Sequence, residues 1–203
     1  MELAIGALEY DGNIRNLVND LLAINPLNTV ISEMRCVSGN IRLPKSSKYI
    51  ERNPKIIDNW KKCRETQSNY TELTFVVPKS VLRANREHIP EDGRMLILTS
   101  YPMVKNFVGI LTGPSVLGAG YPARKPKNYF LRKISETFQV YGAAIVSNFS
   151  HNTDESISLT TAEELGHTFG LDHHGGCIMS GSEKWKEFCS ECKNTFSTYE
   201  YLV

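Results

Sequence analysis

The part of the chain that decides the fold reads Glu163-Glu164-Leu165-Gly166-His167-Thr168-Phe169-Gly170-Leu171-Asp172-His173. Residues four apart in sequence lie on the same face of a helix, one turn from each other. Glu163 and His167 therefore point the same way on a helix that runs to Gly170. Glycine enters the left-handed conformation that ends many helices without a Cβ penalty, so Gly170 is the expected end of this helix. The chain can then turn back and bring His173 to the same place.

This spacing predicts a metal site with a carboxylate beside it. Glu163, His167 and His173 supply one carboxylate and two imidazoles, which Zn²⁺ accepts, and a fourth position stays open for water as in catalytic zinc sites. Glu164 is turned away from these ligands by about a quarter-turn, because a helix has 3.6 residues per turn. Its carboxylate then lies next to the ion, where it can take a proton from the activated water.

Four more soft ligands follow directly. Two residues separate His174 from Cys177, and two residues separate Cys189 from Cys192. A Cys3His set with these spacings is a normal structural zinc site of the zinc-knuckle type. The alternative is a redox-active C-x-x-C pair, but no thioredoxin-like strand–helix–strand context surrounds these two cysteines. The pattern favours a structural zinc ion, which would tie a short and weakly apolar tail to the rest of the chain.

The two motifs together resemble the archaemetzincin family of zinc metallopeptidases, in the metzincin clan. The clan's pattern is H-E-x-x-H-x-x-G-x-x-H, and only its first position differs here, where Glu163 replaces a histidine. Met179 stands at the place of the clan's Met-turn. The family has a cysteine directly after the third histidine, and here His174 takes its place. The spacer to Cys177 is two residues shorter than in the family, and the resemblance covers about residues 157–192.

The resemblance implies a zinc-dependent peptidase that acts on peptides or proteins. Its catalytic zinc would be bound by His167 and His173, with Glu163 at the third position, and Glu164 would be the general base. Its structural zinc would be held by the Cys3His set, His174, Cys177, Cys189 and Cys192. The chain would then carry two zinc ions when the first site is filled, and one otherwise. Met179 would form an apolar floor under the metal and would not be a ligand.

The resemblance also implies a fold. This is an α/β (α+β) zincin fold of the metzincin kind, with a twisted mixed sheet, backing and active-site helices and a small zinc-bound C-terminal subdomain. The whole chain, residues 1–203, would form one catalytic domain. Its upper subdomain would span about residues 1–170, and the small one about residues 171–203. An edge strand above the cleft would pair with the substrate, and residues 106–111 or 141–147 are the candidates.

Glu163 leaves three interpretations open. It can be a zinc ligand, since two histidines and one glutamate form a known catalytic set. It can instead cap the first turn of the helix with its carboxylate. It can also be a substitution that silences the site. In that case the chain would be a catalytically impaired or inactive archaemetzincin-like protein, which keeps the structural zinc and binds a peptide or a partner.

Composition excludes several other classes. The net charge of the 203-residue chain is +1, which does not favour a nucleic-acid partner. No apolar run approaches the ~18 residues of a membrane span, and the N-terminus lacks the layout of a signal peptide. A cytoplasmic monomer without a membrane or nucleic-acid partner is therefore expected. The five cysteines favour metal over disulfides, and Cys36 and Cys63, outside the cluster, are expected to be buried.

Periodicity predicts the remaining elements. Strands are expected at residues 2–8, 28–37, 72–77, 94–99 and 141–147, and helices at residues 13–24, 49–64 and 80–86. The first strand, helix and second strand fit a βαβ crossover. The glycine- and proline-rich residues 112–128 are expected to form a long surface connection. Thr160 and Thr161 each fit a capping box that would start the motif helix, and Trp185 and Phe188 are expected in the small C-terminal core.

Overall fold

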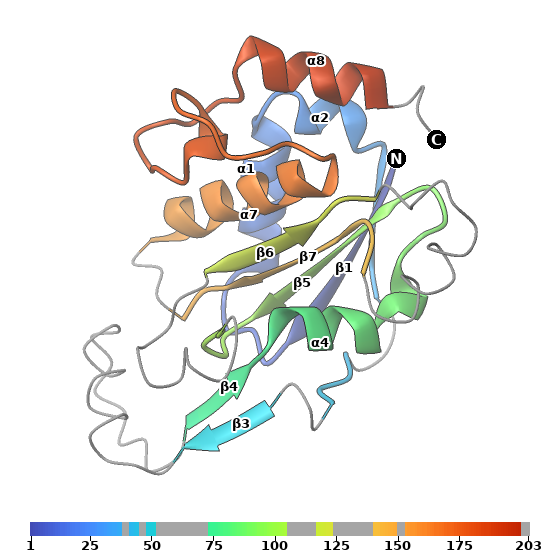
Figure 1. Cartoon of the computed structure of the whole chain (residues 1–203), viewed down its shortest axis with the longest axis vertical. Helices are drawn as coiled ribbons and strands as arrows, with labels where there is room; N and C mark the ends of the chain where they lie inside the picture. The colour runs from blue at the N-terminus through green and yellow to red at the C-terminus, as the bar shows by residue number, and fades with distance from the viewer. Residues whose placement is uncertain are drawn as a thin grey trace.

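A five-stranded sheet forms the centre of the computed structural model, which describes residues 1–37, 41–44, 48–51, 73–104, 117–123, 140–149 and 153–199. The strand order is β2-β1-β5-β7-β6 (Figure 1). The strands are β1 (Glu2–Leu8), β2 (Glu33–Cys36), β5 (Arg94–Thr99), β6 (Gly118–Tyr121) and β7 (Ala143–Ser147). The first four strands in this order run parallel, and only β6 is antiparallel to its neighbour. The predicted α/β class with a mixed sheet is confirmed.

Both faces of the sheet are covered, which explains why the middle residues of β5 and β7 are apolar on both faces. Side chains alternate between the two faces of a strand. In β5, Leu96 and Leu98 join one hydrophobic core, whereas Met95 and Ile97 join the other. Every residue of β5 and β7 is buried. This is the usual state of parallel strands that lie between two layers of helix.

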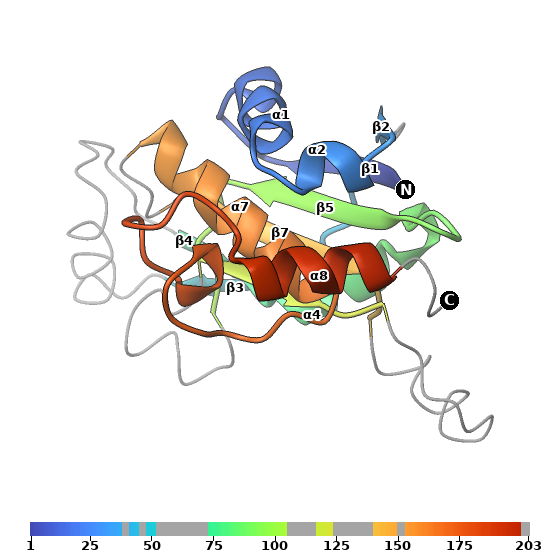
Figure 2. The same cartoon turned by 90° about the horizontal axis from the view of Figure 1, so that it is seen from above.

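The helices divide unequally between the two faces. On one face lie α1 (Ile14–Ala23), α2 (Leu27–Val30), α7 (Asp154–Thr168) and α8 (Ser190–Tyr199), as Figures 1 and 2 show. On the other lies α4 (Pro78–Ala84), followed by the short 3-10 helix η2 (Arg86–His88). A second sheet pairs β3 (Lys48–Glu51) with β4 (Leu73–Val76) in antiparallel fashion. The expected strand–helix–strand start is present, since β1 and β2 are parallel.

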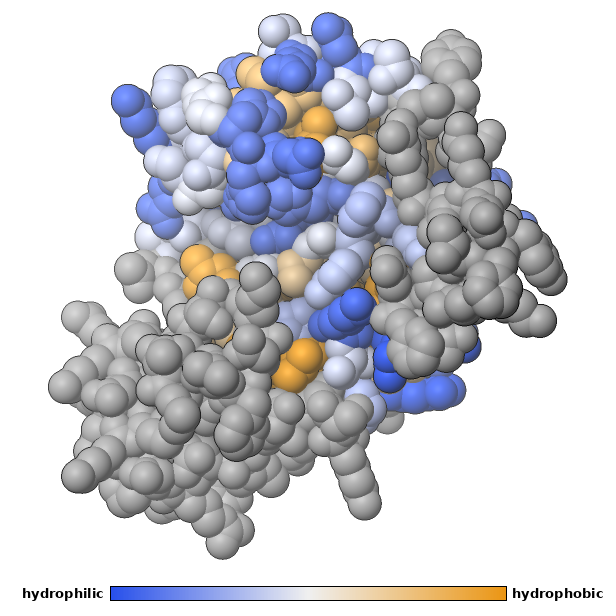
Figure 3. Space-filling view, in the orientation of Figure 1, coloured by the Kyte–Doolittle hydropathy of each residue, from blue (hydrophilic) through white to orange (hydrophobic). Residues whose placement is uncertain are grey.

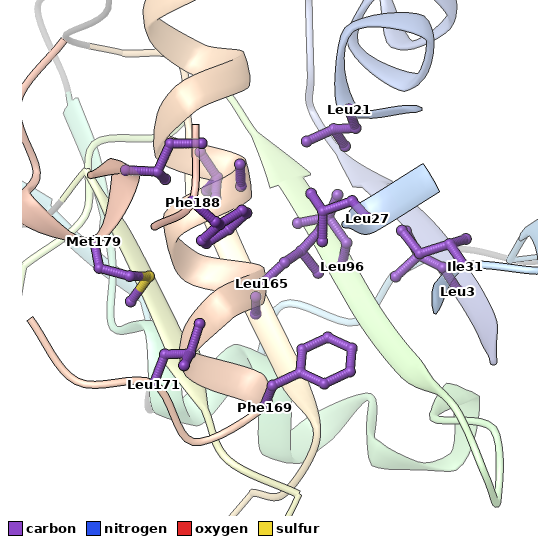
Figure 4. Close-up of a cluster of buried hydrophobic side chains, with 14 of the residues drawn as sticks. Leu3, Leu21, Leu27, Ile31, Leu96, Leu165, Phe169, Leu171, Met179 and Phe188 are labelled. Atoms are coloured by element: carbon purple, nitrogen blue, oxygen red, sulfur yellow. The ribbon is translucent and has the colours of Figure 1, made fainter. Parts of the chain in front are cut away.

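The core on the α7 side joins the sheet to the C-terminal segment (Figure 4). Phe169, at the end of α7, packs against Phe196 of α8 with ring centroids 4.6 Å apart. Phe196 in turn meets Phe188 at 5.0 Å. Phe188 is buried as expected, but the prediction for Trp185 was wrong, because its side chain is 39% exposed. Figure 3 shows a largely hydrophilic surface over this segment.

Several predicted elements differ from those observed. Residues 27–30 form the single turn α2, in which the Pro26 carbonyl accepts from the N–H groups of Thr29 and Val30. Only the later part of the strand predicted at residues 28–37 is therefore observed, and it is the strand β2. The helix predicted for 49–64 was wrong at its start, where β3 lies, and residues 52–64 lie outside the described residues. Cys36 is exposed, contrary to prediction, and Cys63 also lies outside them.

The edge strand was also misplaced. The strand β6 lies inside residues 112–128, which were expected to form only a surface connection. It is β6 that forms the edge beyond β7, so the candidate 141–147 was wrong, because it matches the inner strand β7. The other candidate, 106–111, lies outside the described residues. No helix of the described residues has the length and apolar character needed to cross a membrane.

The motif helix α7 starts earlier than predicted. Thr153 is its N-cap and accepts from the N–H of Ser156 at 3.1 Å. Asp154 and Glu155 follow in the first turn, where negative side chains interact favourably with the helix dipole. The prediction that a capping box at Thr160 or Thr161 starts the helix was therefore wrong, because Thr153, upstream of the apolar residues, is the N-cap. Glu163 consequently lies in the interior of the helix.

Candidate metal centres

The end of α7 turns the chain back toward the helix, as the sequence predicts. Gly170 has a φ of +82°, and its N–H donates to the carbonyl of His167 at 2.9 Å. The N–H of Leu171 donates to the carbonyl of Gly166 at 3.2 Å. These bonds satisfy carbonyls that the helix end would otherwise leave unpaired. The segment from Leu171 onward is thus directed back to the face of α7 that carries His167.

The first cluster consists of Glu163, His167 and His173. One potential ligand atom from each residue lies within 4.8 Å of the others. The two imidazole rings stand edge to face with centroids 4.5 Å apart. The residues that the motif brings together in sequence therefore also meet in space.

Backbone carbonyls fix both histidines of this cluster. Nδ1 of His167 lies 2.7 Å from the carbonyl oxygen of Leu171. Nδ1 of His173 lies 3.2 Å from the carbonyl oxygen of Met179. A histidine that donates its Nδ1 proton keeps the Nε2 lone pair for a metal, and such bonds orient the ring. The chain thus holds the imidazole of His167 in a form that can bind an ion through Nε2, whereas Nδ1 of His173 has a second, acidic neighbour in Glu163.

Glu163 contacts the same group. Its Oε1 lies 3.1 Å from Nδ1 of His173, and the residue is 8% exposed. Burial raises the pKa of Glu163 above its ordinary value, while the charge and hydrogen bond of His173 act in the opposite direction. Its position in the helix interior contradicts the capping interpretation, because the free N–H groups lie only in the first turn.

Glu164 lies beside the cluster and faces the edge strand. It too is 8% exposed. Burial, followed by the neighbouring charge of Glu163, raises the pKa of Glu164 to about 8, although the backbone N–H of Gly120 donates to its carboxylate. The pKa of Tyr121 is raised by burial and by the charge of Glu164. This carboxyl group is therefore close to β6.

Two glycines allow β6 to lie against α7. A Cβ on Gly118 would be 2.3 Å from Cγ of Glu164, and a Cβ on Gly120 would be 2.1 Å from the carbonyl oxygen of Glu164. Alternate residues of a strand share a face, so the Gly118-x-Gly120 spacing places both glycines toward the helix. This role was not predicted from the sequence. The spacing of two glycines was the signal that could have revealed it.

Met179 lies next to His173 of the first cluster, in the 3-10 helix η3 (Ile178–Ser180). It is fully buried, and a Cβ on Gly166 would be 2.6 Å from its sulfur. Figure 4 shows Met179 next to Leu171 and α7. The side chain therefore packs as apolar filling, while its carbonyl oxygen lies near His173 as described above.

The second cluster contains His174, Cys177, Cys189 and Cys192, whose potential ligand atoms also lie within 4.8 Å of one another. Nε2 of His174 lies 3.2 Å from Sγ of Cys177 and 3.3 Å from Sγ of both Cys189 and Cys192. Cys192 Sγ lies 3.8 Å from Cys177 Sγ and 3.6 Å from Cys189 Sγ, and all three cysteines are free. In a tetrahedral zinc site with Zn–S bonds of about 2.3 Å, the sulfur atoms lie about 3.8 Å apart. The two Sγ–Sγ distances given above are close to this value.

The donor chemistry of the second cluster also fits zinc. Nδ1 of His174 lies 2.9 Å from the carbonyl oxygen of Asp172, which leaves Nε2 to face the sulfurs. The backbone N–H of Cys192 donates to Cys189 and lowers the pKa of that thiol to about 6. The thiolate is the form that binds metals. Three sulfurs and one imidazole nitrogen form a common structural zinc set.

Comparisons with known proteins match this fold. The chain is similar to a crystal structure of archaemetzincin from Methanopyrus kandleri, with 17% identity, 99% of this chain and 96% of that chain covered and a TM-score of 0.52. It is also similar to archaemetzincin from Archaeoglobus fulgidus in complex with malonate, with 17% identity, coverage of 96% and 99% and a TM-score of 0.53. A zinc-dependent peptidase from Methanocorpusculum labreanum matches with 16% identity, coverage of 96% and 99% and a TM-score of 0.50.

These matches span nearly the whole chain, so its fold is that of the archaemetzincins, and the fold expected from the sequence is confirmed. No protein-family model matches the chain, and no curated protein matches it in sequence.

Proposed function

We propose that the chain is a metallopeptidase of the archaemetzincin type, which hydrolyses peptide bonds in peptide or protein substrates. One observation carries this proposal: Glu163, His167 and His173 converge at the end of α7, with Glu164 beside them. The zinc peptidases that share the fold support it. The contact between Nδ1 of His167 and the carbonyl oxygen of Leu171 supports it further, because it leaves Nε2 of His167 for the ion.

In this proposal each residue of the first cluster has a distinct role. His167, His173 and Glu163 would hold the catalytic ion. A bound zinc ion would polarise the scissile carbonyl and make water a better nucleophile at neutral pH. Glu164 accepts the proton of the attacking water and passes it to the leaving amine, as a general base and then a general acid.

The second cluster would hold a structural zinc ion in this proposal. His174, Cys177, Cys189 and Cys192 would tie the C-terminal segment to the loop that follows α7. We also propose that residues 1–203 form one catalytic domain. In support, the hydrophobic core that includes Leu3 of β1 extends without a break to Phe196 of α8.

The first test combines metal content with peptidase activity. The chain is reconstituted with zinc, freed of loosely bound ions and measured by elemental analysis, with an expected content of two zinc ions. Peptide cleavage is then compared among the parent, Glu164→Gln and the control Glu155→Gln, which changes an exposed carboxylate of the same helix. We expect Glu164→Gln to lose cleavage by at least about a hundredfold, in line with general-base catalysis. Equal rates in the three proteins would refute the assigned role of Glu164.

A second function has its own supporting observation. Glu163 stands where the clan has a histidine, and the Glu164 carboxylate is 8% exposed and accepts from Gly120. Both features suit a protein that keeps the structural zinc and binds peptides without cleaving them. Glu163→His discriminates between the two functions. A parent without activity that gains cleavage through this substitution supports the binding protein, whereas a parent that cleaves peptides supports the peptidase.

A further inference from the structure

The two clusters offer metals different donors, although the consecutive residues His173 and His174 join them. The first cluster contains one carboxylate, two imidazoles and no sulfur. The second contains three sulfurs and one imidazole. Thiolates select zinc and other soft ions, whereas carboxylate oxygens suit harder ions such as Mn²⁺. One short segment thus contributes to a soft site and to a harder one.

Two buried carboxyl groups strengthen this contrast. Glu163 and Glu164 are both 8% exposed and are adjacent on α7. In the described part of the chain, neither forms an ion pair with a lysine or arginine, and the partner of Glu163 is His173. Buried carboxylates are normally paired with a cation or coordinate a metal. Two carboxylates next to two imidazoles therefore favour a divalent cation with a strong affinity for oxygen.

The position of Glu163 makes its oxygen available to such an ion. It occupies the helix position one turn before His167, so the backbone of α7 fixes it on the same face. Its Oε1 is already 3.1 Å from the ring of His173. The carboxylate is thus held among the imidazoles and is not directed to solvent.

We propose that Glu163 shifts the first cluster away from the zinc preference of a three-histidine site, so that this cluster accepts Mn²⁺ while the thiolate cluster retains zinc. The inference rests on the proposed function, because it takes the first cluster to be the site of the catalytic ion. Zinc also binds sets of two histidines and one glutamate. Compared with a histidine at the same position, the Glu163 carboxylate therefore raises the affinity of the first cluster for Mn²⁺ relative to its affinity for Zn²⁺.

The experiment measures metal binding without reference to catalysis. Each protein is treated with a mild chelator until one zinc ion per chain remains, which also verifies that the thiolate cluster and the fold are intact. Mn²⁺ is then titrated, and the EPR signal of the free ion gives the dissociation constant. Zn²⁺ competition against bound Mn²⁺ gives the affinity ratio. The proteins are the parent, Glu163→His, Glu163→Gln and the control Glu155→Gln.

We expect one Mn²⁺ per chain in the parent and in Glu155→Gln, and binding weaker by at least about tenfold in Glu163→His and Glu163→Gln. The Zn²⁺-to-Mn²⁺ preference should rise by at least about tenfold in Glu163→His. Equal preference in the parent and Glu163→His would overturn the inference but leave the proposed function standing. A parent whose first cluster binds neither ion would overturn both. If Glu163→His does not fold, Glu163→Gln still tests whether Glu163 is a metal ligand. Mn²⁺ binding in Glu163→Gln that is as tight as in the parent would contradict a ligand role for Glu163.

Discussion

Gly118 of β6 lies directly against Glu164 of α7, so close that a Cβ on the glycine would be 2.3 Å from Cγ of the glutamate. The neighbouring Gly120 approaches the backbone of the same residue. The edge strand and the motif helix are therefore in contact at the carboxyl group proposed as the general base. This contact depends on the absence of two side chains.

Gly118→Ala should destabilise the protein by about 1–3 kcal/mol, because an added methyl group in a packed contact forces neighbouring groups apart. The free energy of unfolding from urea denaturation, with zinc present, measures the loss. Gly175→Ala is the matched control, since a Cβ there would have no atom within 4 Å. The control should stay within about 1 kcal/mol of the parent. An unchanged stability of Gly118→Ala would mean that β6 and α7 are not in close contact.

The raised pKa of Glu164 predicts a pH-dependent effect of Glu164→Gln when the first cluster holds no metal. In the folded state the pKa of Glu164 is about 8, whereas its ordinary value is 4.5. Between pH 4.5 and pH 8 the folded protein therefore holds a proton that the unfolded chain has lost. Stability from this group is complete below pH 4.5 and is lost as the pH rises through 8. At about 1.4 kcal/mol per pKa unit the loss is several kcal/mol.

Because glutamine does not titrate, Glu164→Gln should gain stability relative to the parent between pH 5 and pH 9, on the order of a few kcal/mol. Thermal or urea unfolding at both pH values measures this difference. Glu155→Gln, which alters an exposed carboxylate, should show no such trend. A difference that is the same at both pH values would contradict the raised pKa of Glu164.

The thiolate cluster should be required for stability. Cys192 is fully buried, and its sulfur lies near the other three members of the cluster. Cys192→Ser should remove the tightly held zinc, because a neutral hydroxyl replaces a thiolate ligand. Elemental analysis should show one zinc ion fewer per chain, and the melting temperature should fall by at least about 5 °C. Cys36→Ser, at an exposed cysteine outside the cluster, should change neither quantity.

Regular patterns in the sequence were sufficient to predict most of the described fold. The apolar stretch Arg94–Thr99 is β5, and the helical spacing after Asn13 is α1. Errors arose where a local pattern had more than one solution. Residues 28–30 are β-branched or polar and read as a strand, but the hydrogen bonds to Pro26 close a helical turn there. The short β6 contains two glycines in four residues, which resembles a loop until its contact with α7 is known.

The candidate site was easier to predict than the elements around it. The fixed geometry of a helix brings Glu163 close to His167, and Gly170 turns the chain so that His173 joins them. Sequence alone could not reveal that Glu164 is buried beneath β6, because that contact joins residues far apart in the chain. It also could not exclude the capping role of Glu163, which required the observed start of α7 at Asp154.

The adjacency of His173 and His174 predicts that the second cluster positions the first. Nε2 of His174 lies among the three sulfurs of the second cluster. The backbone N–H of His174 donates to the carbonyl oxygen of Met179 at 3.2 Å. The same carbonyl oxygen lies 3.2 Å from Nδ1 of His173. An ion held by His174 would therefore fix the segment that orients His173, in the way that groups outside the ligand shell orient metal-binding histidines.

His174→Ala should weaken metal binding at the first cluster by about 10–100-fold, although His174 is not a ligand there. His174→Cys should retain most of the affinity, because four thiolates also hold zinc and keep the segment in place. Isothermal titration of Co²⁺, with its absorption spectrum, measures the affinity and separates thiolate from nitrogen and oxygen ligation. His88→Ala, in η2, should have no effect. If His174→Ala binds the ion at the first cluster as tightly as the parent, the two clusters are independent, and the segment from Leu171 to Met179 is rigid without its zinc.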